Sequence, residues 1–287
     1  MVGWLKAMIE TVTLRVPSLP LAVAAYHALG YRNAEYGECD AARVALSDPT
    51  LQGCPQHTIL MSEAPLQTLT LVEWDGAIAT PFSAPGWSAM EVLVMNLDAL
   101  YAELPEGFTV LNPPAALSLS AAIRAMQVTG PAGELIYFTE ISGEVPGFDL
   151  PIASRQINHC FVMVNAVTNI ARSIEFYARL LACPAPEPTP ARVSILSRTH
   201  GLDEDHRHDI APIALGSGQL FELDQWVDHC VTEAAPLPCG WHSLALRRSG
   251  PPPASIVVNH RHIDNRLACY EIHPPDGERI DWLCAAA

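Results

Sequence analysis

Three residues in the second half of the chain have side chains that bind metal ions and stand on stretches typical of strands. His242 follows a Gly-Trp pair at the start of "CGWHSLALRR", His159 opens the apolar run "HCFVMV", and Asp281 ends "GERID". Imidazole nitrogens and carboxylate oxygens are ligands of divalent zinc, iron and related ions. These residues are therefore candidate metal ligands, provided that the strands that carry them lie side by side.

Further histidines occur in two short patterns of the same half. The stretches "DHRHDIA" and "NHRHIDN" each hold two histidines separated by one residue, a spacing that places both on one face of a strand. Imidazole titrates near neutral pH, so such a pair can supply a general acid or base. A polar loop or a solvated hairpin would give the same pattern, and both interpretations stay open.

A duplication runs through the chain. The stretch "PGWSAMEVLV" aligns with "CGWHSLALRR", and "GPAGELIYF" aligns with "PPDGERIDW". Apolar strands that contain an acid precede both Gly-Trp pairs, as "LTLVEW" and "QLFELDQW", and the starts of the two halves also resemble each other. Four landmarks in the same order indicate that the halves arose from one ancestral unit.

Each half reads as strand, helix and about three strands, followed by a second such module. Apolar residues at helical spacing behind Thr168 and Asn169 predict a helix from about 170 to 181, and Gly-Ser-Gly in "APIALGSGQLFEL" predicts a hairpin. Modules begin near residues 10, 86, 157 and 240. In the fourth, "SGPPPASIVV" replaces the helical pattern, so we expect its helix to be lost or reduced. The Pro-, Gly- and Ser-rich segment 142–156 is the predicted linker between an N-terminal domain, 1–141, and a C-terminal domain, 157–287.

Composition limits the classes of function. A hydrophobic share of 49% with 16% charged residues is globular, and a net charge of −15 argues against nucleic acid or an anionic membrane as partner. The sequence has no apolar run of the roughly 18–20 residues that span a bilayer. It starts without the pattern of a signal peptide, and its eight cysteines show no CxxC spacing. We therefore expect a cytoplasmic protein with reduced thiols and a small-molecule ligand.

The paired βαβββ modules, the Gly-Trp strand start and the "PDGERID" strand end resemble the vicinal oxygen chelate superfamily. That superfamily includes glyoxalases, extradiol ring-cleaving dioxygenases and bleomycin-resistance proteins. The resemblance covers nearly the whole chain. It implies an α+β fold of four modules paired into two domains, each with a cupped, mixed or antiparallel sheet, and it is compatible with association of further copies of the chain.

The resemblance also implies where ligands lie, because the superfamily places them at the start of the first strand and in the last strand of each module. In the first half the residues at these positions, taken together, hold a divalent metal poorly: Thr11, Glu73, Ser88 and Tyr137. In the second half every one of them can bind metal: His159, Glu222, His242 and Asp281. The duplication thus acts as an internal control and predicts a metal site, held by His159, His242 and Asp281, in the C-terminal domain alone.

Extradiol dioxygenases also have two histidines and a tyrosine beside the metal. His208, His262 and Tyr270 resemble them, although one residue is inserted between Tyr270 and Asp281 relative to the family pattern. Since a shift of one residue turns a strand's side chains to the opposite face, either a bulge absorbs the insertion or Glu271 takes the place of Tyr270.

Three functions follow from these alternatives. The first is an Fe(II) dioxygenase that cleaves a catechol-like aromatic with O2, with His208, His262 and Tyr270 handling protons. The second is an isomerase, epimerase or lyase in which Glu222 is a fourth ligand of Zn, Ni or Mn, or the base. The third is a binding protein without catalysis. The role of Glu222 separates the first two.

Overall fold

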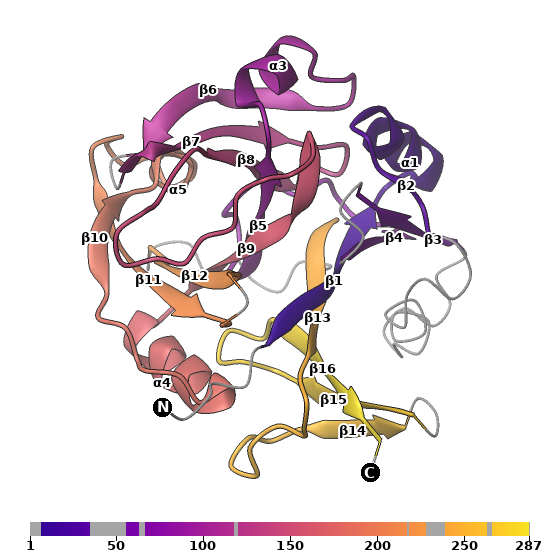
Figure 1. The fold of residues 1–287 in the computed structure, drawn as a ribbon, viewed down its shortest axis with the longest axis vertical. Coiled ribbons are helices and arrows are strands. Elements are labelled where there is room, and N and C mark those ends of the chain that lie inside the picture. Colours follow the sequence, from indigo (N-terminus) through magenta and orange to yellow (C-terminus); the bar gives the residue numbers. More distant parts are fainter. Residues whose placement is uncertain are drawn as a thin grey trace.

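The computed structural model describes residues 7–34, 56–62, 67–117, 120–216, 218–227, 239–262 and 266–286. These residues form two eight-stranded mixed sheets with a few short helices (Figure 1). The predicted α+β class and the repeated module are confirmed.

The elements follow the repeat. The first module contains β1 (Met8–Val16), α1 (Leu19–Ala28), β2 (Arg32–Asn33), β3 (His57–Met61) and β4 (Thr68–Glu73). The second contains β5 (Gly86–Val94), α3 (Leu97–Ala102), β6 (Thr109–Leu117), β7 (Ser120–Thr129) and β8 (Leu135–Ile141). The third contains β9 (Ile157–Val167), α4 (Ile170–Leu181), β10 (Thr189–Arg192), α5 (Ser194–Thr199), β11 (Arg207–Ala214) and β12 (Leu220–Gln225). The fourth contains β13 (Gly240–Arg247), β14 (Asn259–His262), β15 (Leu267–Ile272) and β16 (Arg279–Ala285).

The sheets combine modules from both halves of the chain. One sheet has the order β14-β15-β16-β13-β1-β4-β3-β2 and joins modules one and four; we call it the outer-module sheet. The other has the order β10-β11-β12-β9-β5-β8-β7-β6 and joins modules two and three; we call it the inner-module sheet. Modules one and two therefore do not share a sheet, nor do three and four, and the prediction that consecutive modules pair is wrong.

Strand edges explain this outcome. The first strand of a module pairs in parallel with its own last strand, as β1 does with β4, and its other edge remains for an antiparallel partner. For β1 that partner is β13, and for β5 it is β9. The repeat pattern shows that each of the four modules has such an edge. It does not show which modules join through these edges.

Local predictions are confirmed. Helix α4 begins behind Asn169, whose side chain accepts a hydrogen bond from the Arg172 amide at 3.0 Å, and its apolar face is buried. Between β13 and β14, all of which the structure describes, there is no helix. Strands β11 and β12 pair as the predicted hairpin. None of the described helices is long and apolar enough to cross a membrane.

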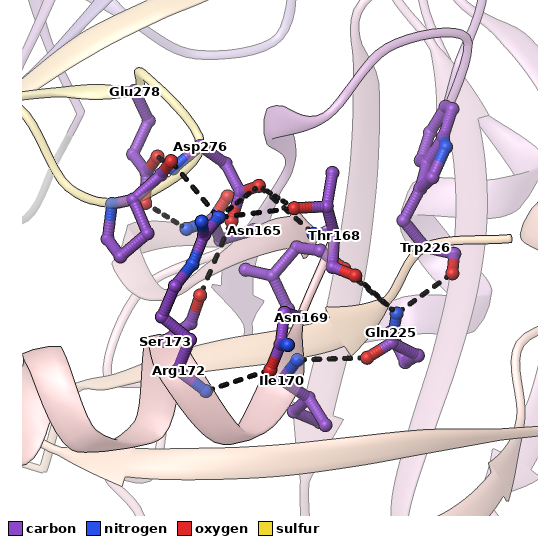
Figure 2. Close-up of polar contacts among 12 residues, drawn as sticks. Asn165, Thr168, Asn169, Ile170, Arg172, Ser173, Gln225, Trp226, Asp276 and Glu278 are labelled. Atoms are coloured by element: carbon purple, nitrogen blue, oxygen red, sulfur yellow. Dashed lines mark hydrogen bonds and ion pairs between the residues drawn. The ribbon is translucent and has the colours of Figure 1, made fainter. Parts of the chain in front are cut away.

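The start of α4 is tied to its surroundings by side chains (Figure 2). Gln225, at the end of β12, accepts from the Ile170 amide and donates to the Thr168 carbonyl. Asp276, in the loop before β16, accepts from the Thr168 amide and from the Ser173 hydroxyl. These bonds hold the start of α4 against the end of β12 and against the loop before β16 in module four.

Matching contacts in the two halves confirm the duplication. The Tyr26 hydroxyl donates to Glu134 at 2.8 Å, and the Tyr177 hydroxyl donates to Glu278 at 2.7 Å. In both pairs a helix tyrosine of one module reaches the glutamate that follows the Gly before the last strand of the next. The two halves are therefore related residue by residue.

The concave side of the inner-module sheet holds a separate apolar cluster. Ala89, Leu93 and Phe161 contribute to it from the strands, and Ile195 contributes from α5. Side chains of the segment 142–156 pack on the same cluster, and Figure 1 shows this segment crossing the hollow side of the sheet. The predicted linker thus covers a sheet face.

Candidate active site in the inner-module sheet

The predicted metal ligands lie on different sheets. His159 belongs to β9 of the inner-module sheet, whereas His242 and Asp281 belong to β13 and β16 of the outer-module sheet. Among the residues that the structure describes, no group of three or more His, Cys, Asp or Glu side chains is placed to hold a metal ion. The donor set present therefore does not fit the divalent metal that the resemblance implies.

Strand register explains why His159 stands apart. Gln67 and Gln219 occupy equivalent places, since Gln67 bonds to the Cys160 amide and Gln219 to the Ile9 amide. The residue after Gln67 is opposite Thr11, and the residue after Gln219 is opposite Val162. Thr11 and Val162 are therefore equivalent. The prediction that His159 is the equivalent of Thr11 is wrong by three positions.

The same register corrects the position assigned to Glu73. Three residues beyond the two glutamines stand Thr70 and Glu222, so Thr70, not Glu73, is the counterpart of Glu222. His159 itself is half-buried, and desolvation lowers its pKa.

In the outer-module sheet, Asp281 faces the same way as Glu271, because the two are opposite each other in the β15–β16 pair. Arg279 binds both carboxylates, at 2.9 Å to Glu271 and 3.2 Å to Asp281. Tyr270 lies on the other face of β15 and stacks on His260. The insertion therefore turns Glu271, not Tyr270, toward Asp281. The side chain of His262 lies outside the described residues.

Four acidic or phenolic groups gather instead on the concave face of the inner-module sheet. Glu222 and Asp224 are two residues apart on β12 and share one face. Glu91 on β5 is opposite Tyr137 on β8, and its carboxylate accepts a hydrogen bond from Thr139 at 3.1 Å.

Burial and mutual repulsion control the protonation of this group. Desolvation raises the pKa of Glu91, and the charge of Glu222 raises it further. Desolvation also raises the pKa of Glu222, and the pKa of Asp224 rises through desolvation and then through Glu222 and Glu91. Tyr137 stays protonated because desolvation, followed by the nearby carboxylates, raises its pKa. Such a cluster retains protons at neutral pH that ordinary carboxylates would have lost.

Several polar atoms of this face have no hydrogen-bond partner in the structure. Both carboxylate oxygens of Asp224, which is 1% exposed, are in this state, as are the indole nitrogen of Trp226 and both ring nitrogens of His200. The rings of His200 and Trp226 meet edge to face at 4.6 Å between centroids. Unsatisfied buried groups are costly, so acceptors and donors left together indicate a place for a polar ligand or water.

Of the three residues predicted to handle protons in a dioxygenase, His208 lies nearest to this group along the paired strands. It is on β11, two residues before Ile210, which is opposite Asp224. The Ser197 hydroxyl and the His208 Nε2 atom are 2.8 Å apart. Desolvation, with His206 and His200 beside it, lowers the pKa of His208 to about 4. His208 is thus a neutral hydrogen-bonding group at pH 7.

The duplication supplies a control for this site. In the outer-module sheet the equivalents of Glu91, Glu222 and Asp224 are uncharged, and the equivalent of Tyr137 is an acid: Ala245, Thr70, Val72 and Asp281. The carboxylate group is therefore specific to one of two similar concave faces.

Sequence reasoning missed Glu91 and Asp224. A signal was present, since "FELDQ" places two acids on one face of an otherwise apolar strand and Glu91 interrupts the apolar run "SAMEVLV". Neither signal reveals that β5 and β12 approach each other across β9, which only the sheet order shows.

Known structures share this fold. Glyoxalase I from Zea mays matches with a TM-score of 0.63 at 13% identity, over 97% of this chain and 92% of that one. A candidate dioxygenase from Bacillus subtilis subsp. subtilis str. 168 matches with a TM-score of 0.56 at 12% identity, over 99% and 87%. No protein-family model and no curated protein matches the sequence. The chain therefore shares the overall fold of these two structures.

Proposed function

We propose that the chain is an enzyme that moves a proton on a small organic carbonyl compound, with Glu222 as the base. The observation that supports the proposal is the group of Glu222, Glu91 and Asp224 on one buried face. Burial raises the pKa of all three, and neighbouring carboxylates raise those of Glu91 and Asp224 further. A general base works best when its pKa lies near the working pH. Isomerases, epimerases and lyases that act next to a carbonyl group commonly begin with such a proton transfer.

Three residues have distinct roles in the proposed reaction. An ionised Glu222 takes a proton from a carbon beside a carbonyl group, and the protonated member of the group, Glu91, returns one to the neighbouring atom. Tyr137, neutral because of its raised pKa, donates a hydrogen bond to the oxygen on which negative charge develops. The apolar cluster of the same face, with α5 and the 142–156 segment over it, limits the access of water.

The Fe(II) dioxygenase predicted from the sequence has less support. His159 is on a different sheet from His242 and Asp281, and Tyr270 faces away from Asp281. Cleavage of a catechol-like ring by O2 therefore stays a prediction without a site among the described residues.

The test is proton exchange with the wild type and two variants. Wild-type protein in D2O is incubated with a panel of 2-hydroxyketones and 2-oxo acids, and loss of the C–H signal is followed by proton NMR. Glu222→Gln keeps the size of the side chain but removes the base, so we expect exchange to fall by about 10²-fold or more. Asp209→Asn, an exposed acid on the neighbouring strand β11, is the matched control and should exchange at the wild-type rate.

The pH profile gives a second readout. Exchange should increase with pH through a pKa above the ordinary carboxylate range, since the base must be ionised. Equal exchange rates for Glu222→Gln and wild type across the panel would reject Glu222 as the base.

A further inference from the structure

A cavity lies where the two Gly-Trp motifs meet. It has a volume of about 440 Å³, and the starts of β5 and β13 line it. The loops before β8 and β16 also contribute to the lining. Since its lining does not include Glu91, Glu222 or Asp224, it is separate from the proposed active site.

Aromatic rings form much of the cavity wall. The Trp87 indole donates to the Arg279 carbonyl at 3.1 Å, and the Trp241 indole donates to the Leu135 carbonyl at 3.0 Å. With their nitrogens held by backbone, the rings serve as fixed apolar surfaces. Trp74 and the buried ring of Phe82 also line the cavity.

Arg15 brings a cationic group to the lining of the cavity. The guanidinium of Arg15 lies over the Trp74 ring at 4.1 Å from its centroid, and the residue is 3% exposed. The repeat allows a comparison with the equivalent position in module three, where Ala166 and Trp226 correspond to Arg15 and Trp74. There the ring of His200, and not an arginine, packs on the Trp226 indole. An arginine held against an aromatic ring is pre-organised to bind a planar carboxylate.

The acids around the cavity are engaged by protein groups. Glu134 and Glu278 accept the tyrosine hydroxyls, and Asn165 also donates to Glu278. Asp276 is held by Thr168, Ser173 and Arg172, as Figure 2 shows. Desolvation raises the pKa of Glu134 to about 7 and also raises that of Glu278, which reduces their repulsion of an anion.

We propose that this cavity binds a flat aromatic carboxylate, with its ring against the tryptophan side chains of the lining and its carboxylate on Arg15. The volume lies within the range of roughly 300–1,000 Å³ of small-molecule sites. The inference does not depend on the proposed proton-transfer activity.

The test compares a charged and an uncharged probe of the same shape by calorimetric titration. We expect 2-naphthoate to bind the wild type about tenfold more tightly than 2-naphthylmethanol, since one ion pair in a desolvated site has at least that effect. Arg15→Met, which keeps the length of the chain on Trp74, should remove this difference by weakening 2-naphthoate alone. Arg124→Met, which removes an exposed arginine paired with Asp98, is the matched control and should bind both probes as the wild type does.

Two further variants locate the site and keep the test independent of the folding of Arg15→Met. Ser83→Trp, at an exposed position of the lining, should block both probes. Glu222→Gln should leave both affinities unchanged, which separates this cavity from the proposed active site. Equal wild-type affinities for the two probes, undiminished 2-naphthoate binding by Arg15→Met or Ser83→Trp, or no binding of 2-naphthoate at all would each overturn the proposal.

Discussion

Asp224 is buried with both carboxylate oxygens unpartnered, an arrangement that a folded chain tolerates more easily when the group carries a proton. Its pKa is raised in the folded state, so between the unfolded and folded pKa values the folded chain binds more protons than the unfolded one. The stability that this group contributes is present below its unfolded pKa and is lost as pH rises through its folded pKa.

Asp224→Asn removes this loss because an amide does not ionise. We expect the variant to be more stable than the wild type at pH 8, by on the order of 1 kcal/mol, with the difference shrinking toward pH 4. Urea denaturation at the two pH values measures it. Asp98→Asn is the opposite control: the Arg124 hydrogen bond lowers the pKa of Asp98, so any stability that Asp98 contributes is lost only as pH falls. A variant Asp224→Asn that is less stable than the wild type at pH 8 would contradict the interpretation.

At this scale, chemically capable residue types can be read from the sequence, but their neighbours in space cannot. Chemically capable residues were predicted correctly as strand residues: His159, His242 and Asp281 all lie on strands. Their grouping failed because the sequence alignment placed His159 three positions from the true equivalent of Thr11, and because β9 pairs with β5 and not with β13. Which two strand edges join depends on contacts between distant parts of the chain, and no local pattern shows them.

Among the elements, the helix–strand contacts repeat between the halves but differ in detail. Glu278 accepts from Tyr177 and Asn165 through the same oxygen, whereas the corresponding oxygen of Glu134 accepts from Tyr26. A buried carboxylate that loses its donor costs more when no other donor is at hand.

Tyr26→Phe should therefore destabilise the protein more than Tyr177→Phe. We expect about 1–3 kcal/mol for the first and about 1 kcal/mol or less for the second, from denaturation at pH 8. Because loss of the tyrosine donor raises the pKa of Glu134 further, the cost of Tyr26→Phe should be smaller at pH 5, where Glu134 is protonated in the wild type as well. Equal costs for the two substitutions would indicate that the hydroxyls have no part in stability.

Helix α4 shows what local sequence predicts well. Its cap, its apolar face and its end follow from residues a few positions apart, and the structure agrees with each. The missing helix of module four was equally readable, since a run of prolines cannot supply helical hydrogen bonds.

For the molecule as a whole, the joining of modules one with four and two with three decides how it holds together. One large apolar cluster includes residues of all four modules. The halves on either side of 142–156 each contain one part of both sheets, so neither has a complete sheet of its own.

Separate expression of residues 1–141 and 157–287 tests this arrangement. We expect neither fragment alone to give a stable monomer, because β1 and β13 would each lose an antiparallel partner, as would β5 and β9. Mixed or co-expressed, they should copurify as a one-to-one complex that unfolds cooperatively. A monomeric fragment with its own sharp unfolding transition would show that a half is an independent domain.

The pairing of β1 with β13 also sets an order of events on the ribosome. Glu10 and Arg247, which form an ion pair across these strands, are 237 positions apart. Modules two and three are neighbours in the chain, so the inner-module sheet has all its strands once β12 has emerged. One edge of β1 and its apolar residues stay uncovered until β13 has been made. A strand synthesised before the whole inner-module sheet is thus completed after it, and the growing chain is vulnerable to aggregation through the uncovered edge of β1.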